Sequence, residues 1–234
     1  MTDQIDILNG GYVKYIDHMG SDNSAIRAAR ASFAKDNPVW NEKDARLLNF
    51  LIREGHMSCF RHAALTFQCK SPLFVARQHY KYVVASAHVE DQHGWNESSR
   101  RYVTQEPEFH IPNETEWRST PANKKQGSGA PIDPRIGEIA TNELIDYIDK
   151  GCDLYERWMD LGIAPEQARL FLPAYGMFVN YQWTVSLANL IHFLNERLAH
   201  DAQDEITELA KAVLELTTPL FPATMKALFG GIDG

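Results

Sequence analysis

The chain has 234 residues, of which 44% are hydrophobic and 23% are charged. This composition is typical of a globular protein with a buried core and excludes the disordered and fibrous classes. The 31 acidic residues outnumber the 23 basic ones and give a formal net charge of −8, so no overall basic field attracts nucleic acid or anionic lipid. An anionic ligand must therefore be held by a local group of cations.

The three cysteines, Cys59, Cys69 and Cys152, are an odd number without CxxC spacing. This favours a reducing compartment over a disulfide framework or a structural zinc site. No basic N-terminal segment precedes an apolar run, and polar residues interrupt the most apolar stretch, 177–194, so we expect neither a signal peptide nor a membrane span. The sequence predicts a cytoplasmic protein with neither nucleic acid nor a membrane as partner.

Apolar periodicity and helix-start and turn signals predict a mixture of helices, strands and loops. In chain order we expect helices over 23–35 and 42–54, a strand over 62–70, a helix over 73–86, loops over 87–95 and 107–134, helices over 136–161 and 165–172, a strand over 177–185, and helices over 187–198 and 202–216. No regular βαβ repeat links these elements, which favours the α+β class. We expect one domain over 1–234.

The strand over 62–70 is predicted by Ala63, Leu65, Phe67 and Cys69, which alternate with more polar residues. This period of two is typical of a half-buried strand. The loop over 107–134 contains five prolines. A loop of this length is uncommon in a compact domain unless it covers a site or contacts a partner.

The densest group of polar side chains is the run NESSRRY, residues 96–102, which follows Arg77, Gln78 and Lys81 by about one helix. Cations, a carboxylate, hydroxyls and an amide suit an anionic ligand that also offers hydrogen-bonding edges, such as a nucleotide. The alternative is an exposed loop with balanced charge. The glycine-rich loops that usually bind phosphate, GxGxxG and GxxxxGK[ST], are absent.

Several segments, taken in order, resemble the flavin-dependent thymidylate synthases. They are SAIRAARASF (24–33), GHMSCFRH (55–62), FVARQ (74–78), NESSRRY (96–102), the pairs LP (172–173) and WT (183–184), and FLNERLAHDAQDEI (193–206). The resemblance spans about residues 5 to 217. Several independent blocks in one order are more specific than one short motif.

This resemblance implies a single-domain α+β fold with a central, mainly antiparallel sheet, assembled as a homotetramer with FAD bound in active sites between subunits. It also implies a reaction, in which dUMP is methylated at C5 to dTMP for de novo biosynthesis. Methylenetetrahydrofolate would donate the one-carbon unit, and NADPH would reduce the FAD.

The resemblance also implies roles for individual residues. Arg197 matches the arginine placed at the uracil ring to favour ionisation of N3, and we expect it to be catalytic because a guanidinium stays charged at any working pH. The residues expected to bind dUMP are Gln78, Lys81, Glu97, Ser98, Ser99, Arg100, Arg101 and Arg197. The residues expected to contact FAD are His56, Ser58, Lys81, Tyr82, Val83, Glu97, Ser186 and His192.

The chain departs from the family pattern at two places. The usual Arg-His-Arg is matched by Lys81, Tyr82 and Val83, and nine residues, 87–95, stand where the pattern has one. The flavin-binding Asn-x-Arg is matched by residues 186–188, Ser-Leu-Ala, and the arginine before it by Asn180. We hypothesise that Arg100, Lys124, Lys125 or a histidine of the insertion supplies the missing positive charge.

Other interpretations remain beside this one. A related enzyme could use flavin and folate to hydroxymethylate or methylate another pyrimidine nucleotide, or the chain could be a non-catalytic nucleotide-binding homologue. A cysteine-dependent synthase is disfavoured, because the three cysteines are expected to be small buried thiols. His88, Glu90, Asp91 and His93 match no metal-ligand template and are taken as a solvated loop, so we expect no metal. The aromatic residues Trp158, Trp183 and Phe193 are expected in the core.

Overall fold

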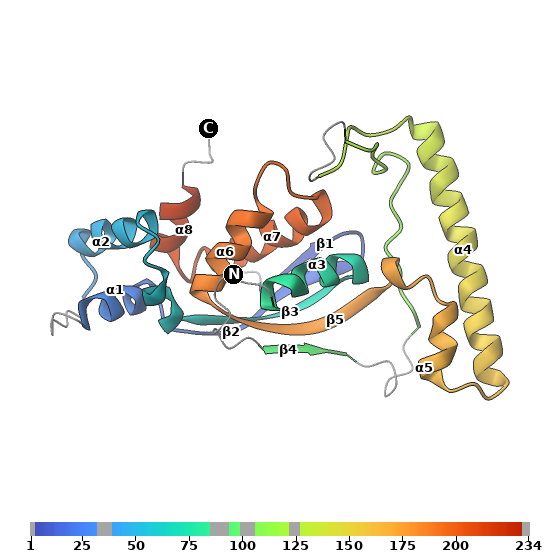
Figure 1. Ribbon diagram of the computed structural model, residues 1–234, viewed down its shortest axis with the longest axis horizontal. Helices are drawn as coiled ribbons and strands as arrows, with labels where there is room; N and C mark the ends of the chain where they lie inside the picture. Colours follow the sequence, from blue (N-terminus) through green and yellow to red (C-terminus); the bar gives the residue numbers. More distant parts are fainter. Residues whose placement is uncertain (1–2, 32–38, 85–93, 99–105, 122–126, 231–234) are drawn as a thin grey trace.

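The computed structural model describes residues 3–31, 39–84, 94–98, 106–121 and 127–230 (Figure 1). Helices and antiparallel strands alternate irregularly along the chain, as the α+β class requires. The strands are β1 (Gln4–Ile7), β2 (Gly11–Met19), β3 (Ala64–Pro72), β4 (Gly94–Glu97) and β5 (Phe178–Ser186). The helices are α1 (Asp22–Ala31), α2 (Glu42–Arg53), η1 (Met57–His62), α3 (Leu73–Val84), α4 (Pro134–Asp160), α5 (Pro165–Ala168), η2 (Arg169–Phe171), η3 (Ala174–Gly176), α6 (Leu187–Arg197), α7 (Asp204–Thr217) and α8 (Pro222–Phe229).

The sheet has the order β1-β2-β3-β5-β4, and every pair of neighbours is antiparallel. The predicted alternation in β3 is confirmed, because Leu65, Phe67 and Cys69 are fully buried. Across the β3–β5 pair Phe67 lies opposite Trp183, with ring centroids 5.8 Å apart. The alternate positions are more polar and carry a hydrogen bond between the hydroxyls of Thr66 and Thr184 at 3.0 Å. One face of the central strands is therefore apolar.

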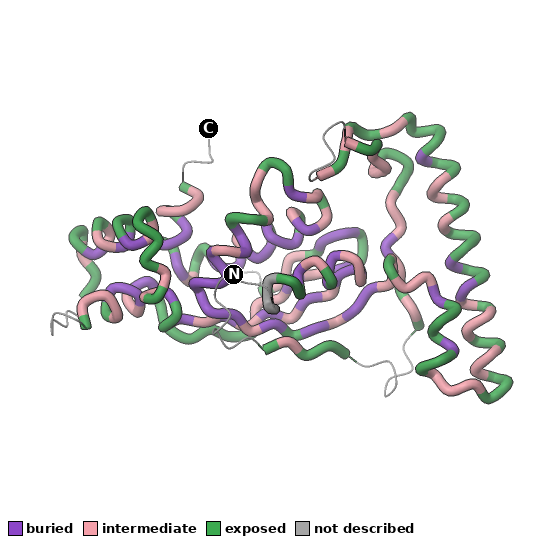
Figure 2. The backbone as a smooth tube through the Cα atoms, viewed as in Figure 1, coloured by how far each residue is buried: buried purple, intermediate pink, exposed green. Residues whose placement is uncertain are grey.

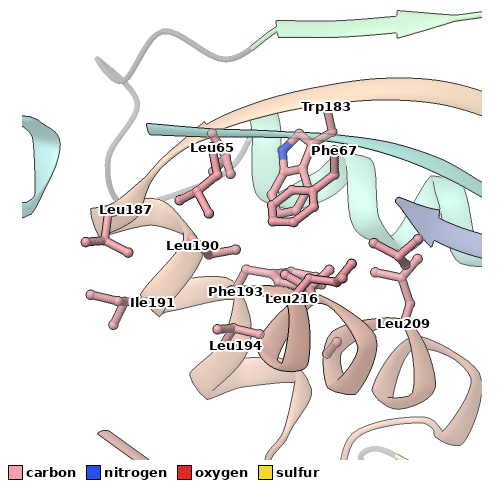
Figure 3. Packing of buried hydrophobic residues seen from close by; sticks show 14 of the residues in the cluster. Leu65, Phe67, Trp183, Leu187, Leu190, Ile191, Phe193, Leu194, Leu209 and Leu216 are labelled. Carbon is pink, nitrogen blue, oxygen red and sulfur yellow. The ribbon is translucent and has the colours of Figure 1, made fainter. Parts of the chain in front are cut away.

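Helices α6 and α7 cover the apolar face, and their side chains meet those of β3 and β5 (Figure 3). Phe193, Leu194 and Leu209 are fully buried between the two layers. Helix α3 lies beside α7 on the same face (Figure 1). The buried residues accordingly concentrate in β3, β5, α6 and α7 (Figure 2). Burial of this apolar area is the main stabilising contribution to the fold.

Helices α1, α2 and α8 pack together at one end of the sheet (Figure 1). The buried carboxylate of Asp22 accepts hydrogen bonds from the backbone N–H groups of Ala223 and Thr224 and from the Thr224 hydroxyl, at 2.8, 3.0 and 2.6 Å. These contacts satisfy the N-terminus of α8, which has no other cap, and they join two segments distant in sequence. Asp22, the first residue of α1, thus links α1 to α8 through hydrogen bonds.

Helix α4 extends along the side of the molecule, away from the sheet (Figure 1). The Trp117 indole N–H donates to Thr141 Oγ1, which donates to the Pro112 carbonyl, both at 2.8 Å. Gly137 is required on this helix, because a Cβ there would collide with the carbonyl oxygen of Glu114. Most of the helix is exposed or half-buried (Figure 2). Within the described residues, no helix is both long and apolar enough to cross a membrane.

The structure differs from several sequence predictions. The hairpin of β1 and β2 and the helix α8 were not predicted, and the region 94–97 forms β4 at the edge of the sheet instead of continuing the polar loop. The strand predicted over 62–70 starts later, because 57–62 forms η1, and the helix over 165–172 divides into α5 and η2.

Trp183 and Phe193 are core residues as predicted, but the prediction for Trp158 is wrong. Trp158 is half-buried on α4 and stacks on Phe171 with centroids 5.9 Å apart. Cys69 is fully buried, whereas Cys59 and Cys152 are only half-buried. The misses at Trp158 and Cys152 have one cause, because the apolar spacing of α4 does not reveal that this helix stands away from the sheet.

Candidate active site

Helix α3 begins directly after β3 and presents two different faces. Leu73, Ala76, Arg77 and Tyr80 follow helical spacing along one face and line a cavity of about 290 Å³. The opposite face carries His79, which is fully buried against the sheet. The helix therefore separates the cavity from the core.

The second wall of the cavity comes from β4, through Trp95 and Glu97. These residues are two apart on a strand, so their side chains lie on the same side of it. The rings of Trp95 and Tyr80 meet edge to face, with centroids 5.2 Å apart. A guanidinium, a carboxylate and two aromatic rings thus surround one cavity, which is a combination suited to a flat, polar heterocycle.

A buried cluster of polar and aromatic side chains lies next to this cavity. The hydroxyl of Tyr181 and Nδ1 of His79 form a hydrogen bond of 3.0 Å. Trp95 stacks on Tyr181, with centroids 4.0 Å apart and the planes inclined by 16°. The His79 ring also meets Trp183 edge-on at 4.2 Å and stacks on Phe193 at 4.7 Å. The cluster joins α3, β4, β5 and α6.

Two charged candidate residues act on this cluster. Burial lowers the pKa of His79 to about 3, with the positive charge of Arg197 as the second cause. Burial also raises the pKa of Tyr181 well above its ordinary value, with Cys69 as the next cause and Glu97 contributing. Because His79 and Tyr181 are hydrogen-bonded to each other, Arg197 and Glu97 both lie near the same buried pair. At neutral pH the pair is uncharged.

Gln78 precedes His79 on α3, and its side-chain amide donates to Oε1 of Gln203 at 2.5 Å. Gln203 comes directly before α7. The hydroxyl of Thr207 on α7 donates to the carbonyl of Arg197 at 2.9 Å. These bonds connect the end of α6 with α3 and α7. Glu97 lines the cavity and the charge of Arg197 acts on His79, whereas the side chain of Gln78 bonds Gln203 beside α7.

The remaining candidates for dUMP binding are not all placed. Lys81 is exposed on α3, and Ser98 is exposed directly after β4, where its N–H donates to the Asn180 carbonyl at 2.8 Å. Ser99, Arg100 and Arg101 lie outside the described residues, as do Lys124, Lys125 and the polar residues of 88–93.

The candidates for FAD contact lie on several elements. His56 and Ser58 are exposed at η1, which packs against α6. Ser186 is buried and caps α6, where its hydroxyl accepts from the Asn189 N–H at 3.2 Å. His192 is half-buried on α6. Lys81 and Glu97 are exposed on α3 and β4, and the side chains of Tyr82 and Val83 are outside what the structure describes.

Sequence reasoning missed His79 and Tyr181, whose hydrogen bond joins α3 to β5. The only available signal for His79 was its position one turn after Val75, on the apolar face of α3. In the sequence, Tyr181 is one of several apolar residues that alternate along the strand predicted over 177–185. Their hydrogen bond depends on packing between elements distant in sequence, which periodicity does not report.

Comparisons with known proteins indicate the family of this chain. A family model described as "Thymidylate synthase complementing protein" matches residues 14–223. The chain is 34% identical over 227 residues to the flavin-dependent thymidylate synthase of Thermotoga neapolitana, covering 96% of this chain and 93% of that protein. This chain belongs to the flavin-dependent thymidylate synthase family. A second family member, from Thermosipho africanus, is 32% identical over 221 residues, covering 94% of this chain and 92% of its own.

The family fold is also seen in a solved structure described as the UMP/dUMP methylase PolB from Streptomyces cacaoi bound with 5-Br dUMP. That structure has a TM-score of 0.80 and 24% sequence identity, and the match covers 97% of both chains. At this identity the likeness concerns the fold. It agrees with the α+β class and the antiparallel sheet expected from the sequence.

Cys69 is fully buried in the core, and we expect it to be a poor nucleophile. Burial raises the pKa of its thiol to about 12, so at pH 8 the thiolate fraction is roughly a thousandfold lower than in an unfolded chain. We expect iodoacetamide to leave Cys69 unmodified in the folded protein and to modify it in concentrated urea. Peptide mass spectrometry distinguishes the two states, and the half-buried Cys59 serves as the internal comparison. Labelling of Cys69 at the rate of Cys59 in the folded protein would contradict its assignment as an inert core thiol.

Proposed function

We propose that this chain converts dUMP to dTMP, with methylenetetrahydrofolate as one-carbon donor and FAD, reduced by NADPH, as hydride carrier. The main support for the proposal is that Arg197 acts electrostatically on His79 and Glu97 on Tyr181, within one hydrogen-bonded pair next to the cavity that Glu97 lines. With Gln78 on the neighbouring helix α3, these residues offer a cation, a carboxylate and an amide, which match the hydrogen-bonding edges and the negative charge of a pyrimidine nucleotide. Membership of the thymidylate synthase family supports the same reaction.

Arg197 has the central role in this proposal. C5 of uracil is a poor nucleophile, and a guanidinium at the ring stabilises negative charge that develops across N3 and O4. Arg197 is half-buried, so its charge acts in a less polar environment than bulk water and has a larger effect there. The residues proposed to bind the nucleotide with it are Gln78, Lys81, Glu97, Ser98, Ser99, Arg100 and Arg101.

The proposed FAD contacts are compatible with a large cofactor lying on the subunit surface. His56, Ser58, Lys81 and Glu97 are all exposed, so their polar groups are open to a ligand. Ser186 is buried and already caps α6, so its contribution to FAD binding would be through the helix it starts. His192, Tyr82 and Val83 complete the proposed set. Bound flavin would supply the hydride, while the chain's own residues bind and orient the nucleotide.

We also propose a homotetramer in which each chain is one catalytic domain. The outer surface of α4 supports association, because Ile136, Ile139 and Tyr147 are 58%, 59% and 59% exposed. Large apolar side chains grouped on one helix are typical of a contact surface. A second copy of the chain covering α4 would also bring exposed polar residues of two subunits together, as an active site between subunits requires.

The visible spectrum of the purified protein tests the cofactor part of this proposal. We expect absorption bands of oxidised flavin that bleach on anaerobic addition of NADPH, and that bleach faster when dUMP is present. Mass spectrometry after addition of methylenetetrahydrofolate should then identify dTMP. A hydroxymethylated product would replace the proposed reaction with the related one. A colourless protein that takes up no added FAD and binds dUMP without turnover would indicate a nucleotide-binding homologue.

A further inference from the structure

His79 is a fully buried histidine whose ring is fixed on several sides. Tyr181 holds Nδ1 through the hydrogen bond of 3.0 Å, and the Tyr181 hydroxyl lies 3.3 Å from that of buried Ser71. Among the described residues Nε2 has no hydrogen-bond partner, so Tyr181 alone sets the ring's rotation by hydrogen bonding. Burying an imidazole with one ring nitrogen unpaired costs free energy that an apolar ring in the same place would not cost.

The ring rests on the part of α6 that leads to Arg197. Phe193 stacks on His79 at 4.7 Å, and Phe193 and Arg197 are four residues apart, so both lie on the same side of α6, one turn from each other. The positive charge of Arg197 also contributes to lowering the pKa of His79. The imidazole therefore packs against α6 one turn before the proposed catalytic guanidinium.

The chemistry of the ring suits this position. A carboxylate in place of His79 would pair with Arg197 and neutralise it, whereas a buried cation would repel it. An imidazole that remains neutral at working pH does neither. It fills the space between Trp183 and Phe193 with a rigid ring and places no opposing or repelling charge beside Arg197.

We propose that His79 is a positioning residue for the thymidylate synthase reaction: held by Tyr181, it supports the turn of α6 that carries Arg197 and so orients that guanidinium toward the pyrimidine. This inference rests on the proposed function, because Arg197 is placed at the pyrimidine there. His79 itself is buried and is not assigned a contact with the nucleotide.

A double-mutant cycle on dUMP binding tests the inference. Calorimetric titration of the FAD-loaded protein would compare wild type, His79→Phe, Arg197→Ala and the double variant. Phenylalanine keeps an aromatic ring against Phe193 but loses the bond to Tyr181. We expect His79→Phe to raise the dUMP Kd about fivefold to tenfold when Arg197 is present, and less than about twofold when it is absent, because coupled residues in contact are non-additive.

Two further variants keep the test independent of general damage to the fold. Tyr181→Phe removes the hydroxyl that holds His79 but keeps the stacking ring, and it should show the same dependence on Arg197 if His79→Phe does not fold. His110→Phe is the matched control. His110 is also buried, bonds the Leu8 carbonyl through Nδ1 at 3.1 Å and contacts Phe74 and Phe178. We expect it to lower the Tm without changing the dUMP Kd.

The possible outcomes distinguish failure of the positioning role of His79 from failure of the proposed function. An equal loss of affinity on His79→Phe in both backgrounds, or no loss in either, would overturn the positioning role while leaving the proposed function intact. Failure of the wild-type protein to bind dUMP would overturn the proposed function and this inference with it. A loss that depends on Arg197 would support the role.

Discussion

Replacing Arg197 with alanine is expected to lower the rate of dTMP formation by about two to three orders of magnitude, the usual effect of removing one group that stabilises developing charge. The positive charge of the guanidinium acts on the buried His79, and alanine cannot stabilise charge on the pyrimidine. The fold and the flavin content should remain, because Arg197 is at the last turn of α6 and only half-buried. Product formation by mass spectrometry and the flavin spectrum measure the two effects separately.

Arg53→Ala is the matched control for this experiment. Arg53 also ends a helix, α2, but its side chain is exposed and pairs with Glu54 at 2.9 Å. An exposed pair of this kind contributes little to stability, so this variant should retain wild-type turnover. Arg197→Lys should recover only part of the rate, since an ammonium lacks the planar geometry of the guanidinium. Near-normal dTMP formation by Arg197→Ala would defeat the role assigned to this residue.

Replacing Trp183 with alanine is expected to lower the free energy of unfolding by about 3–5 kcal/mol, which is the usual cost of removing a large aromatic side chain from a core. Trp183 is fully buried and contacts Phe67, His79 and Phe193, with centroids 5.8, 4.2 and 5.4 Å away. For a chain of this size the Tm should fall by about 10 °C. Urea unfolding followed by circular dichroism measures the difference.

Two further variants, Trp40→Ala and Trp183→Phe, serve as comparisons for Trp183→Ala. Trp40 is 37% exposed, so its removal should cost well under half as much. Trp183→Phe keeps an aromatic ring and removes an indole N–H that has no hydrogen-bond partner among the described residues. This variant should therefore lose less free energy of unfolding than Trp183→Ala. If Trp183→Ala were no more destabilising than Trp40→Ala, the sheet–helix layer around Trp183 would not be the main core.

The local elements were largely predictable from the sequence because their signals are local. The alternation of Leu65, Phe67 and Cys69 indicates which face of β3 is buried, whatever strand pairs with it. Helix α2 is likewise specified by its own residues, since Asn41 and Asp44 form a capping box and Gly55 follows at a φ of +67°. Such features require only neighbours along the chain.

The N-terminal hairpin was not predictable in the same way. Its turn places Leu8 and Asn9 at φ values of 53° and 52°, which non-glycine residues adopt rarely. Partners distant in sequence hold it, because the Leu8 N–H donates to Glu208 at 2.7 Å and its carbonyl bonds His110. β4 is similar, since a strand of four residues exists there only through pairing with β5.

Patterns in the sequence were enough to predict the α+β class and, through the order of the motifs, the family to which the chain belongs. They also identified Gln78, Glu97 and Arg197 as candidates. Only the folded structure shows that Arg197 and Glu97 act on the same buried, hydrogen-bonded pair of His79 and Tyr181. The physical reason is that a hydrogen bond or ring contact between α3, β5 and α6 depends on how the layers pack, whereas periodicity and capping signals extend only over the few residues of one element.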